Sequence, residues 1–275
     1  MGSHGPQVDA RALEEAFGLS RARVVNDFEA AGYGVAAIAA KLGEVADAAE
    51  AECIEINAGE SGRGPHAPLA VLGPGTGLGM CLLVWDEASS SYRVVPGEGG
   101  HATFAPRGDK QRLLQEYVEQ RDGFCELESL LCGRGLVTIY EFLRAEVGLE
   151  GTDEAPDKEP ADVTAAALAR DCELCEQAVD MFLEMLGAEA GHMALRSLAG
   201  GVFVIGGIAP RLRERVLASL AEDTEERSHL LDGFLYGANS KFSPILKATP
   251  LHIVTDGDVG LHGAALVARA ALSSV

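Results

Sequence analysis

The alternation of apolar and polar positions divides the chain into short strand-like and longer helix-like stretches. Short apolar runs predict strands at 22–25, 54–57, 69–72, 80–85, 92–95, 201–205 and 251–254. Apolar positions recurring every three or four residues predict helices at 10–18, 28–42, 110–120, 126–131, 137–147, 162–198, 211–220 and 261–272. Strands mixed with long helices, without an internal repeat, indicate an α/β or α+β fold.

Two glycine-rich segments interrupt this pattern. The first, at 72–79, is Leu-Gly-Pro-Gly-Thr-Gly-Leu-Gly between two predicted strands. It matches neither the Gly-x-Gly-x-x-Gly pattern of dinucleotide-binding folds nor a phosphate loop ending in Lys-Ser/Thr. A hairpin with Thr76 at its tip can still offer backbone amides and a hydroxyl to phosphate oxygens. The alternative is an ordinary tight hairpin, but four glycines in seven residues favour phosphate binding.

The second segment, at 96–101, is Pro-Gly-Glu-Gly-Gly-His, with Glu98 and His101 as its only polar side chains. A carboxylate and an imidazole three residues apart can hydrogen-bond to vicinal hydroxyls. A metal site would need a third ligand, and none lies at a telling distance in the sequence. A phosphate-binding turn followed by a hydroxyl-binding loop suggests a kinase that acts on a polyol or sugar.

Two other positions allow two interpretations each. Asp27 follows a predicted strand and precedes a helix, so it can cap that helix or act as a general base on a substrate hydroxyl; spacing alone favours the cap. Gly206 and Gly207 end an apolar strand, where α/β proteins bind nucleotides. An ordinary connection between strand and helix explains these two glycines equally well.

Composition narrows the range of partners. The 275 residues include 22 basic and 42 acidic side chains, a formal net charge of −20, which argues against nucleic acid and anionic membranes as partners. Five glycines and three prolines interrupt the uncharged stretch 64–85, so it does not predict a membrane helix. Six cysteines without repeated spacing predict reduced thiols, and Cys172 and Cys175 fit an apolar helix stripe better than a zinc or redox site. With no secretory signal at the N-terminus, we expect a soluble, cytoplasmic protein.

Taken together, these segments resemble the bacterial-type ATP-dependent glucokinases of the actin-like sugar kinase superfamily. The matching stretches lie in the same order as in the family, at 25–30, 72–79, 97–106, 127–133 and 200–211. The resemblance runs from about Ala10 to the C-terminus. It implies an α/β fold of the actin-like ATPase (ribonuclease H-like) type with two domains, and transfer of the ATP γ-phosphoryl group to glucose in glycolysis.

The resemblance also implies roles for individual residues. Asp27 becomes the catalytic base on the sugar 6-hydroxyl, which overturns the interpretation as a helix cap. The residues expected to bind the sugar are Asn26, Asp27, Glu98, His101 and Glu128. The residues expected to bind ATP are Gly75, Thr76 and Gly77 at the phosphates and Gly206 and Gly207 beside adenosine. ATP and Mg²⁺ are the expected cofactors, with no residue assigned as a metal ligand, and a homodimer is expected because dimers are common in the family.

The chain departs from the family in one respect. The Asp-x-Gly-Gly-Thr phosphate motif that opens the family's small domain is not found in this sequence. We therefore expect a reduced small domain at 1–37, completed by the C-terminal helix 256–275, beside a large domain at 38–255. The alternative function is a catalytically impaired sugar-binding or regulatory remnant of a glucokinase, and an incomplete gene model is a third interpretation. Loss of half of a phosphate clamp should slow phosphoryl transfer severely.

Overall fold

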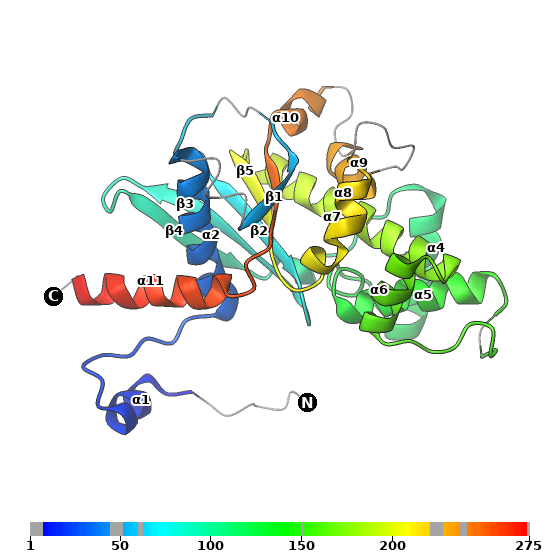
Figure 1. Cartoon of the computed structure of the whole chain (residues 1–275), viewed down its shortest axis with the longest axis horizontal. Helices are drawn as coiled ribbons and strands as arrows, with labels where there is room; N and C mark the ends of the chain where they lie inside the picture. Colours follow the sequence, from blue (N-terminus) through cyan, green and yellow to red (C-terminus); the bar gives the residue numbers. More distant parts are fainter. Residues whose placement is uncertain are drawn as a thin grey trace.

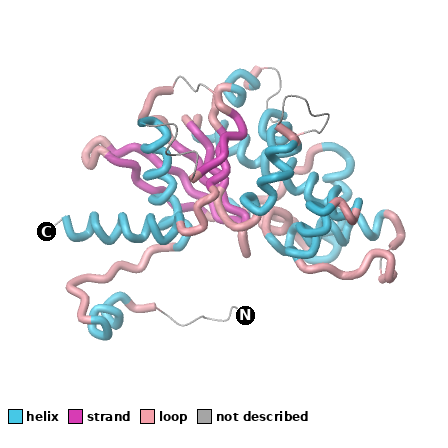
Figure 2. Tube along the Cα trace, viewed as in Figure 1, coloured by secondary structure: helices cyan, strands magenta, loops and turns pink. Residues whose placement is uncertain are grey.

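A single mixed β-sheet forms the centre of the molecule (Figures 1 and 2). The computed structural model describes residues 8–44, 52–59, 63–149, 151–220, 228–236 and 241–273. The strands are β1 (Cys53–Asn57), β2 (Leu69–Pro74), β3 (Leu78–Asp86), β4 (Ser91–Gly97), β5 (Gly201–Val204) and β6 (Leu251–Val254), in the order β1-β6-β5-β2-β3-β4. The central strands β2, β5 and β6 are parallel, while β1, β3 and β4 run antiparallel to their neighbours.

Helices pack on both faces of the sheet. The helices of the described residues are α1 (Ala10–Phe17), α2 (Asp27–Glu44), α4 (Gly108–Asp122), α5 (Gly133–Glu146), α6 (Pro160–Ala169), α7 (Glu173–Ser197), α8 (Arg213–Ala218), α9 (His229–Tyr236), α10 (Ser243–Lys247) and α11 (Val259–Ser273), and not all of them touch the sheet. On one face α2 buries Val35 and Ile38 against Cys81 and Leu83 of β3. The larger core lies on the other face, where α7 packs against β2 and β5 and also contacts α5, α6 and α9. Helices α4, α5 and α6 extend this core away from the sheet (Figure 1).

Close contact between α2 and α11 depends on two glycines. A Cβ atom on Gly34 would collide with the carbonyl oxygen of Val259, and one on Gly263 would collide with the carbonyl oxygen of Ala30. These backbones can approach because neither position has a side chain. The packing brings the start of α11 next to the N-terminal half of α2.

The predicted strand at 22–25 is wrong. Residues 21–26 have no regular secondary structure. The backbone amide of Ala22 donates to Glu14 Oε1 at 2.6 Å, and Val24 is half-exposed. A β-strand forms when its backbone amides bond to a neighbouring strand, and here the Ala22 amide bonds to a side chain of α1 instead.

Two helix predictions also differ from the structure. Residue 126 forms an isolated β-bridge and residues 127–131 form bends and turns, because the backbone here bonds to the loop after β4, as in the bond from Leu127 N to Ala102 O of 2.9 Å. The long pattern at 162–198 contains two helices, since Arg170 ends α6 in the left-handed conformation (φ 59°) and Cys172 caps α7. Helices α9 and α10 were not predicted, and the other predicted helices and strands are confirmed to within a few residues.

The expected domain boundary between residues 37 and 38 falls inside the continuous helix α2. Helix α2 packs on α11, and the expected small domain contains both the start of α2 and α11. Helix α2 also packs on β3 and β4, which belong to the expected large domain. Residues 1–7 and 274–275 of the expected small domain lie outside the described residues. The division into a small and a large domain stays a prediction.

Two further findings concern the described residues as a whole. None of the helices among them is long and apolar enough to cross a membrane. All six cysteines are free thiols, and only Cys172 is not fully buried. Burial raises the pKa of the Cys81 thiol to about 12, as expected for a thiol packed in a core.

Candidate active site

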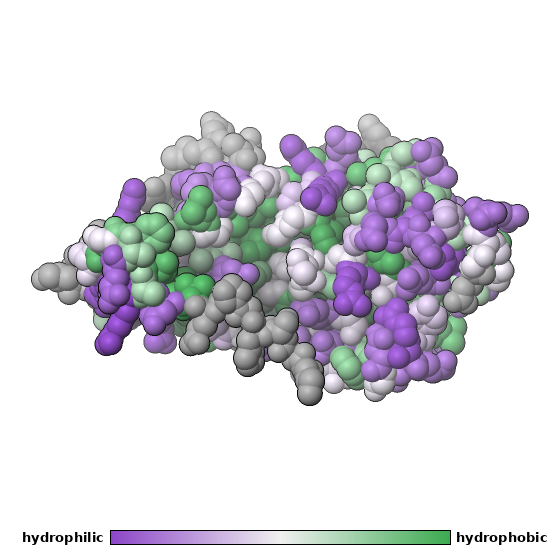
Figure 3. All heavy atoms as spheres, turned by 90° about the horizontal axis from the view of Figure 1, so that it is seen from below, coloured by the Kyte–Doolittle hydropathy of each residue, from purple (hydrophilic) through white to green (hydrophobic). Residues whose placement is uncertain are grey.

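A cavity of about 790 Å³ opens where the N-terminus of α2 meets the β2–β3 hairpin and the loops that follow β4 and β5. Figure 3 shows the molecule from below, with a surface hollowed near the middle and a mostly hydrophilic part over α5 and α6 on the right. Nine of the ten residues expected to bind sugar or ATP line the cavity: Asn26, Asp27, Gly75, Thr76, Gly77, Glu98, Glu128, Gly206 and Gly207. The tenth, His101, is not in the cavity wall but lies next to it, with Nε2 4.0 Å from Glu98 Oε2.

Asn26 and Asp27 occupy the start of α2. Asn26 Oδ1 accepts hydrogen bonds from the amides of Phe28 (2.9 Å) and Glu29 (3.0 Å), so Asn26 is the residue that caps the helix. Asp27 Oδ1 accepts a bond of 2.8 Å from Phe28 N, and the carboxylate stays exposed at the cavity. The cap considered for Asp27 is therefore supplied by its neighbour.

The glycines of the β2–β3 hairpin have different neighbours. Cβ atoms on Gly73 and Gly79 would collide with the Phe28 ring, and one on Gly77 would collide with the Glu128 carboxylate. Only Gly75 faces open space. Three of the four glycines therefore allow the hairpin to pack closely against α2 and Glu128. The sequence pattern alone could not show whether a glycine was needed for this packing or for phosphate binding.

Glu128 joins the hairpin to the loop after β4. Its Oε2 atom accepts a hydrogen bond from Leu78 N at 2.7 Å, and its backbone amide donates to Gly100 O at 2.8 Å. The residue stands in a turn instead of the predicted helix. The first bond holds its side chain and the second its backbone at the cavity wall, where one carboxylate oxygen remains to accept a bond from a ligand.

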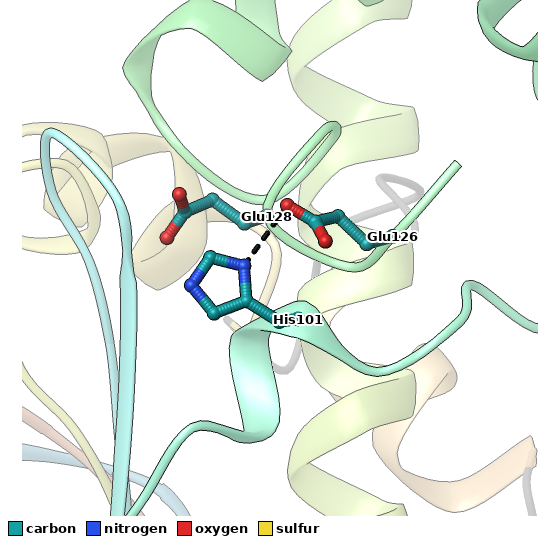
Figure 4. Close-up of side chains that lie close together, drawn as sticks. All are labelled: His101, Glu126 and Glu128. Atoms are coloured by element: carbon teal, nitrogen blue, oxygen red, sulfur yellow. Dashed lines mark hydrogen bonds and ion pairs between the residues drawn. The ribbon is translucent and has the colours of Figure 1, made fainter. Parts of the chain in front are cut away.

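His101 is surrounded by carboxylates (Figure 4). It ends the short 3₁₀ helix Gly99–His101, and its Nδ1 atom lies 3.0 Å from Glu126 Oε1. This hydrogen bond is the largest cause that raises the pKa of His101 above 6.5; the charges of Glu126, Glu128 and Glu98 act in the same direction.

Glu126 is not among the residues that the sequence pattern predicted for the site. It stands 25 residues from His101 and belongs to no motif, so only the folded chain brings the two together. Ligand atoms of His101, Glu126 and Glu128 lie within 4.8 Å of one another, although sequence spacing indicated no third ligand here. Glu126 Oε1 and Glu128 Oε2 each already take part in a protein hydrogen bond, with His101 Nδ1 and with Leu78 N.

The remaining wall follows β5 and β6. Gly206 has a φ of 93°, and a Cβ atom there would lie 2.6 Å from Pro74 O, so only glycine fits. Gly207 has open space around it, which leaves its backbone accessible. Asp256, a cavity residue the sequence analysis assigned no role, accepts bonds of 2.9 Å from Asp258 N and from His262 Nδ1.

An α/β fold with a cavity that brings a glycine hairpin together with the carboxylates of Asp27, Glu98 and Glu128 is the arrangement expected of a sugar kinase of the actin-like class. Comparison with known proteins agrees: the model of the Glucokinase family matches residues 1–271. The chain belongs to the glucokinase family.

Individual relatives support the same assignment. A glucokinase from Nostoc sp. is 32% identical over 280 residues, which cover 95% of this chain and 75% of that protein. A solved glucokinase from an Antarctic psychrotroph has a TM-score of 0.73 and 28% identity, covering 93% of this chain and 70% of that one. A ROK family glucokinase from Streptomyces griseus, solved in complex with glucose and AMPPNP, has a TM-score of 0.54 and 19% identity, covering 94% of this chain and 72% of that one, and shows similarity of fold.

Proposed function

We propose that this glucokinase-family protein transfers the γ-phosphoryl group of ATP to the 6-hydroxyl of glucose, giving glucose 6-phosphate. The observation that carries the proposal is the single cavity lined by Asp27, by the carboxylates of Glu98 and Glu128, and by the glycine segments after β2 and β5. A base, a hydroxyl-binding site and a phosphate-binding site must share one cavity for direct transfer between two bound ligands.

In this mechanism Asp27 accepts the proton of the glucose 6-hydroxyl as the hydroxyl oxygen attacks the γ-phosphorus, and the bond from the γ-phosphorus to the β–γ bridging oxygen breaks so that ADP leaves. The side-chain amide of Asn26 donates to the sugar, since only its oxygen is used by the helix cap. Glu98, His101 and Glu128 hold other hydroxyls, which orients the attacking oxygen. Closure of two domains over the sugar would exclude water, a competing acceptor of the phosphoryl group.

The backbone amides and hydroxyl of residues 75–77 would bind phosphate oxygens, and the backbone at Gly206 and Gly207 would lie beside adenosine. The carboxylate of Asp256 on the same cavity wall is an oxygen donor of the type that Mg²⁺ takes, so the wall fits an ATP complex of this ion. When bound, Mg²⁺ would neutralise charge on the transferring phosphoryl group.

Glucose-dependent release of ADP by the purified chain with MgATP tests the proposal. Release that requires glucose, and that disappears with water as the only acceptor, supports a glucokinase. No release, with glucose still raising the melting temperature, would support a sugar-binding remnant instead. The cytoplasmic location, the homodimer and the preference for glucose over related hexoses stay predictions; a panel of hexoses in the same assay tests the last.

A further inference from the structure

Glu126 lies next to the hydroxyl-binding loop, outside the residues assigned to the substrate. It forms an isolated β-bridge with Thr103, and the neighbouring Leu127 N donates to Ala102 O at 2.9 Å. Backbone pairing between these segments therefore sets the position of Glu126 relative to His101. The backbone on both sides of the contact between the two side chains is therefore held in place by hydrogen bonds.

The contact fixes which edge of the imidazole faces the ligand. Glu126 Oε1 lies 3.0 Å from His101 Nδ1, and a carboxylate can only accept, so Nδ1 carries the proton and donates it to this bond. Nε2 is then the atom left for a ligand, and it lies 4.0 Å from Glu98 Oε2. That separation is too long for a direct hydrogen bond, but a hydroxyl group between the two atoms could bond to both.

The charges around His101 also favour a ring that donates a hydrogen bond from Nε2. The charged groups acting on the ring are the three carboxylates Glu98, Glu126 and Glu128, and all of them favour the imidazolium form. In that form Nε2–H donates to a hydroxyl oxygen, while Glu98 accepts from a hydroxyl hydrogen. The side chain of Glu126 is 23% exposed against 54% for His101, so it supports the ring from the more buried side.

We propose that Glu126 is a positioning residue for sugar recognition, which holds the Nδ1 edge of His101 so that Nε2 faces the glucose hydroxyls beside Glu98. The inference rests on the proposed function, because it assumes that glucose binds at Glu98 and His101. It extends that function to a residue with no expected contact to the sugar.

Glucose binding measured by calorimetry tests this role. Glu126→Ala should weaken binding roughly tenfold at pH 7, as expected for loss of a hydrogen bond to a charged group. In a His101→Ala background the same change should alter the dissociation constant by less than about twofold, because the two residues act as one unit. The control is Glu116→Gln, which removes an exposed carboxylate on α4 and should bind like the wild type.

A pH titration of the His101 ring by NMR, without glucose, supplies a readout that a purely structural role would not change. Glu126→Gln should lower the midpoint, because the imidazolium loses its nearest carboxylate. The alkaline fall in glucose affinity should move to lower pH with it. The isosteric glutamine also carries the test if the alanine variant melts early.

Either of two results would overturn the inference. One is an unchanged His101 midpoint in Glu126→Gln, and the other is a loss of glucose affinity that persists in the His101→Ala background. Absence of glucose binding by the wild-type chain is a separate result, which contradicts the proposed function itself.

Discussion

Asn26 and Asp27 show how two adjacent polar residues divide structural and chemical roles. Asn26 satisfies the first amides of α2, which leaves the Asp27 carboxylate exposed at the cavity. From the sequence alone, spacing favoured a cap over a general base for Asp27, and residue preference could not distinguish the two neighbours because Asp and Asn are favoured equally at a cap. Only the hydrogen bonds show which of the two caps the helix.

The first prediction concerns Asp27→Asn. We expect kcat to fall by roughly a hundredfold or more, the usual effect of removing a general base. The melting temperature should not change, because the cap belongs to Asn26 and an amide oxygen can still accept from Phe28 N. Steady-state kinetics and thermal melting check both parts. Asp171→Asn, an exposed position between α6 and α7, is the matched control, and an unchanged kcat in Asp27→Asn would remove Asp27 from the mechanism.

A second prediction concerns His252 in β6, which is 6% exposed and stacks on Phe203. Burial lowers the pKa of His252 to about 4 from 6.5. Between these values the unfolded chain binds a proton that the folded chain does not, so the free energy of unfolding should fall as pH falls from 6.5 towards 4. The slope reaches at most about 1.4 kcal/mol per pH unit.

Urea unfolding at pH 7.5, 6.5 and 5.5 measures this loss. His252→Phe should remove this loss of stability. The free energy of unfolding of the variant should therefore rise relative to that of the wild type as pH falls from 7.5 to 5.5. Parallel pH curves for the two proteins would contradict the assignment.

At the scale of elements, the sequence identified most helices and strands but not how they meet. Glycines at 73, 77 and 79 were visible as a pattern, yet their reasons are the Phe28 ring and the Glu128 carboxylate, which come from distant segments. The helix predicted at 126–131 was wrong for the same reason, since its backbone bonds across to the loop after β4. Periodicity reports local preference, and these features depend on contacts between segments.

The packing of α2 against α11 gives a third prediction. Gly263→Ala should lower the melting temperature clearly, because the new Cβ collides with the backbone of Ala30. Gly260→Ala, in the same helix with no atom within 4 Å of the new Cβ, should leave stability equal or raise it by up to about 1 kcal/mol. Thermal melting of both variants checks the contrast. Equal effects would show that α2 and α11 do not pack closely in solution.

For the whole molecule, the net charge of −20 makes binding of ATP depend on local features. These local features meet in the cavity, which is lined by the β2–β3 hairpin, the Gly206–Gly207 turn and the start of α2. The residue types and motifs of this cavity could be predicted, because each lies in a short continuous segment. Glu126 and Asp256 could not, because their importance arises only from the neighbours that the fold gives them.

The most direct test of the account is a crystal structure of the chain with glucose and a non-hydrolysable ATP analogue. We predict glucose O6 within hydrogen-bond reach of an Asp27 carboxylate oxygen, at about 2.6–3.2 Å, with the γ-phosphate of the analogue on its other side. Glucose bound away from Asp27, or an analogue that does not contact the β2–β3 hairpin, would contradict the claim that this one cavity performs the transfer.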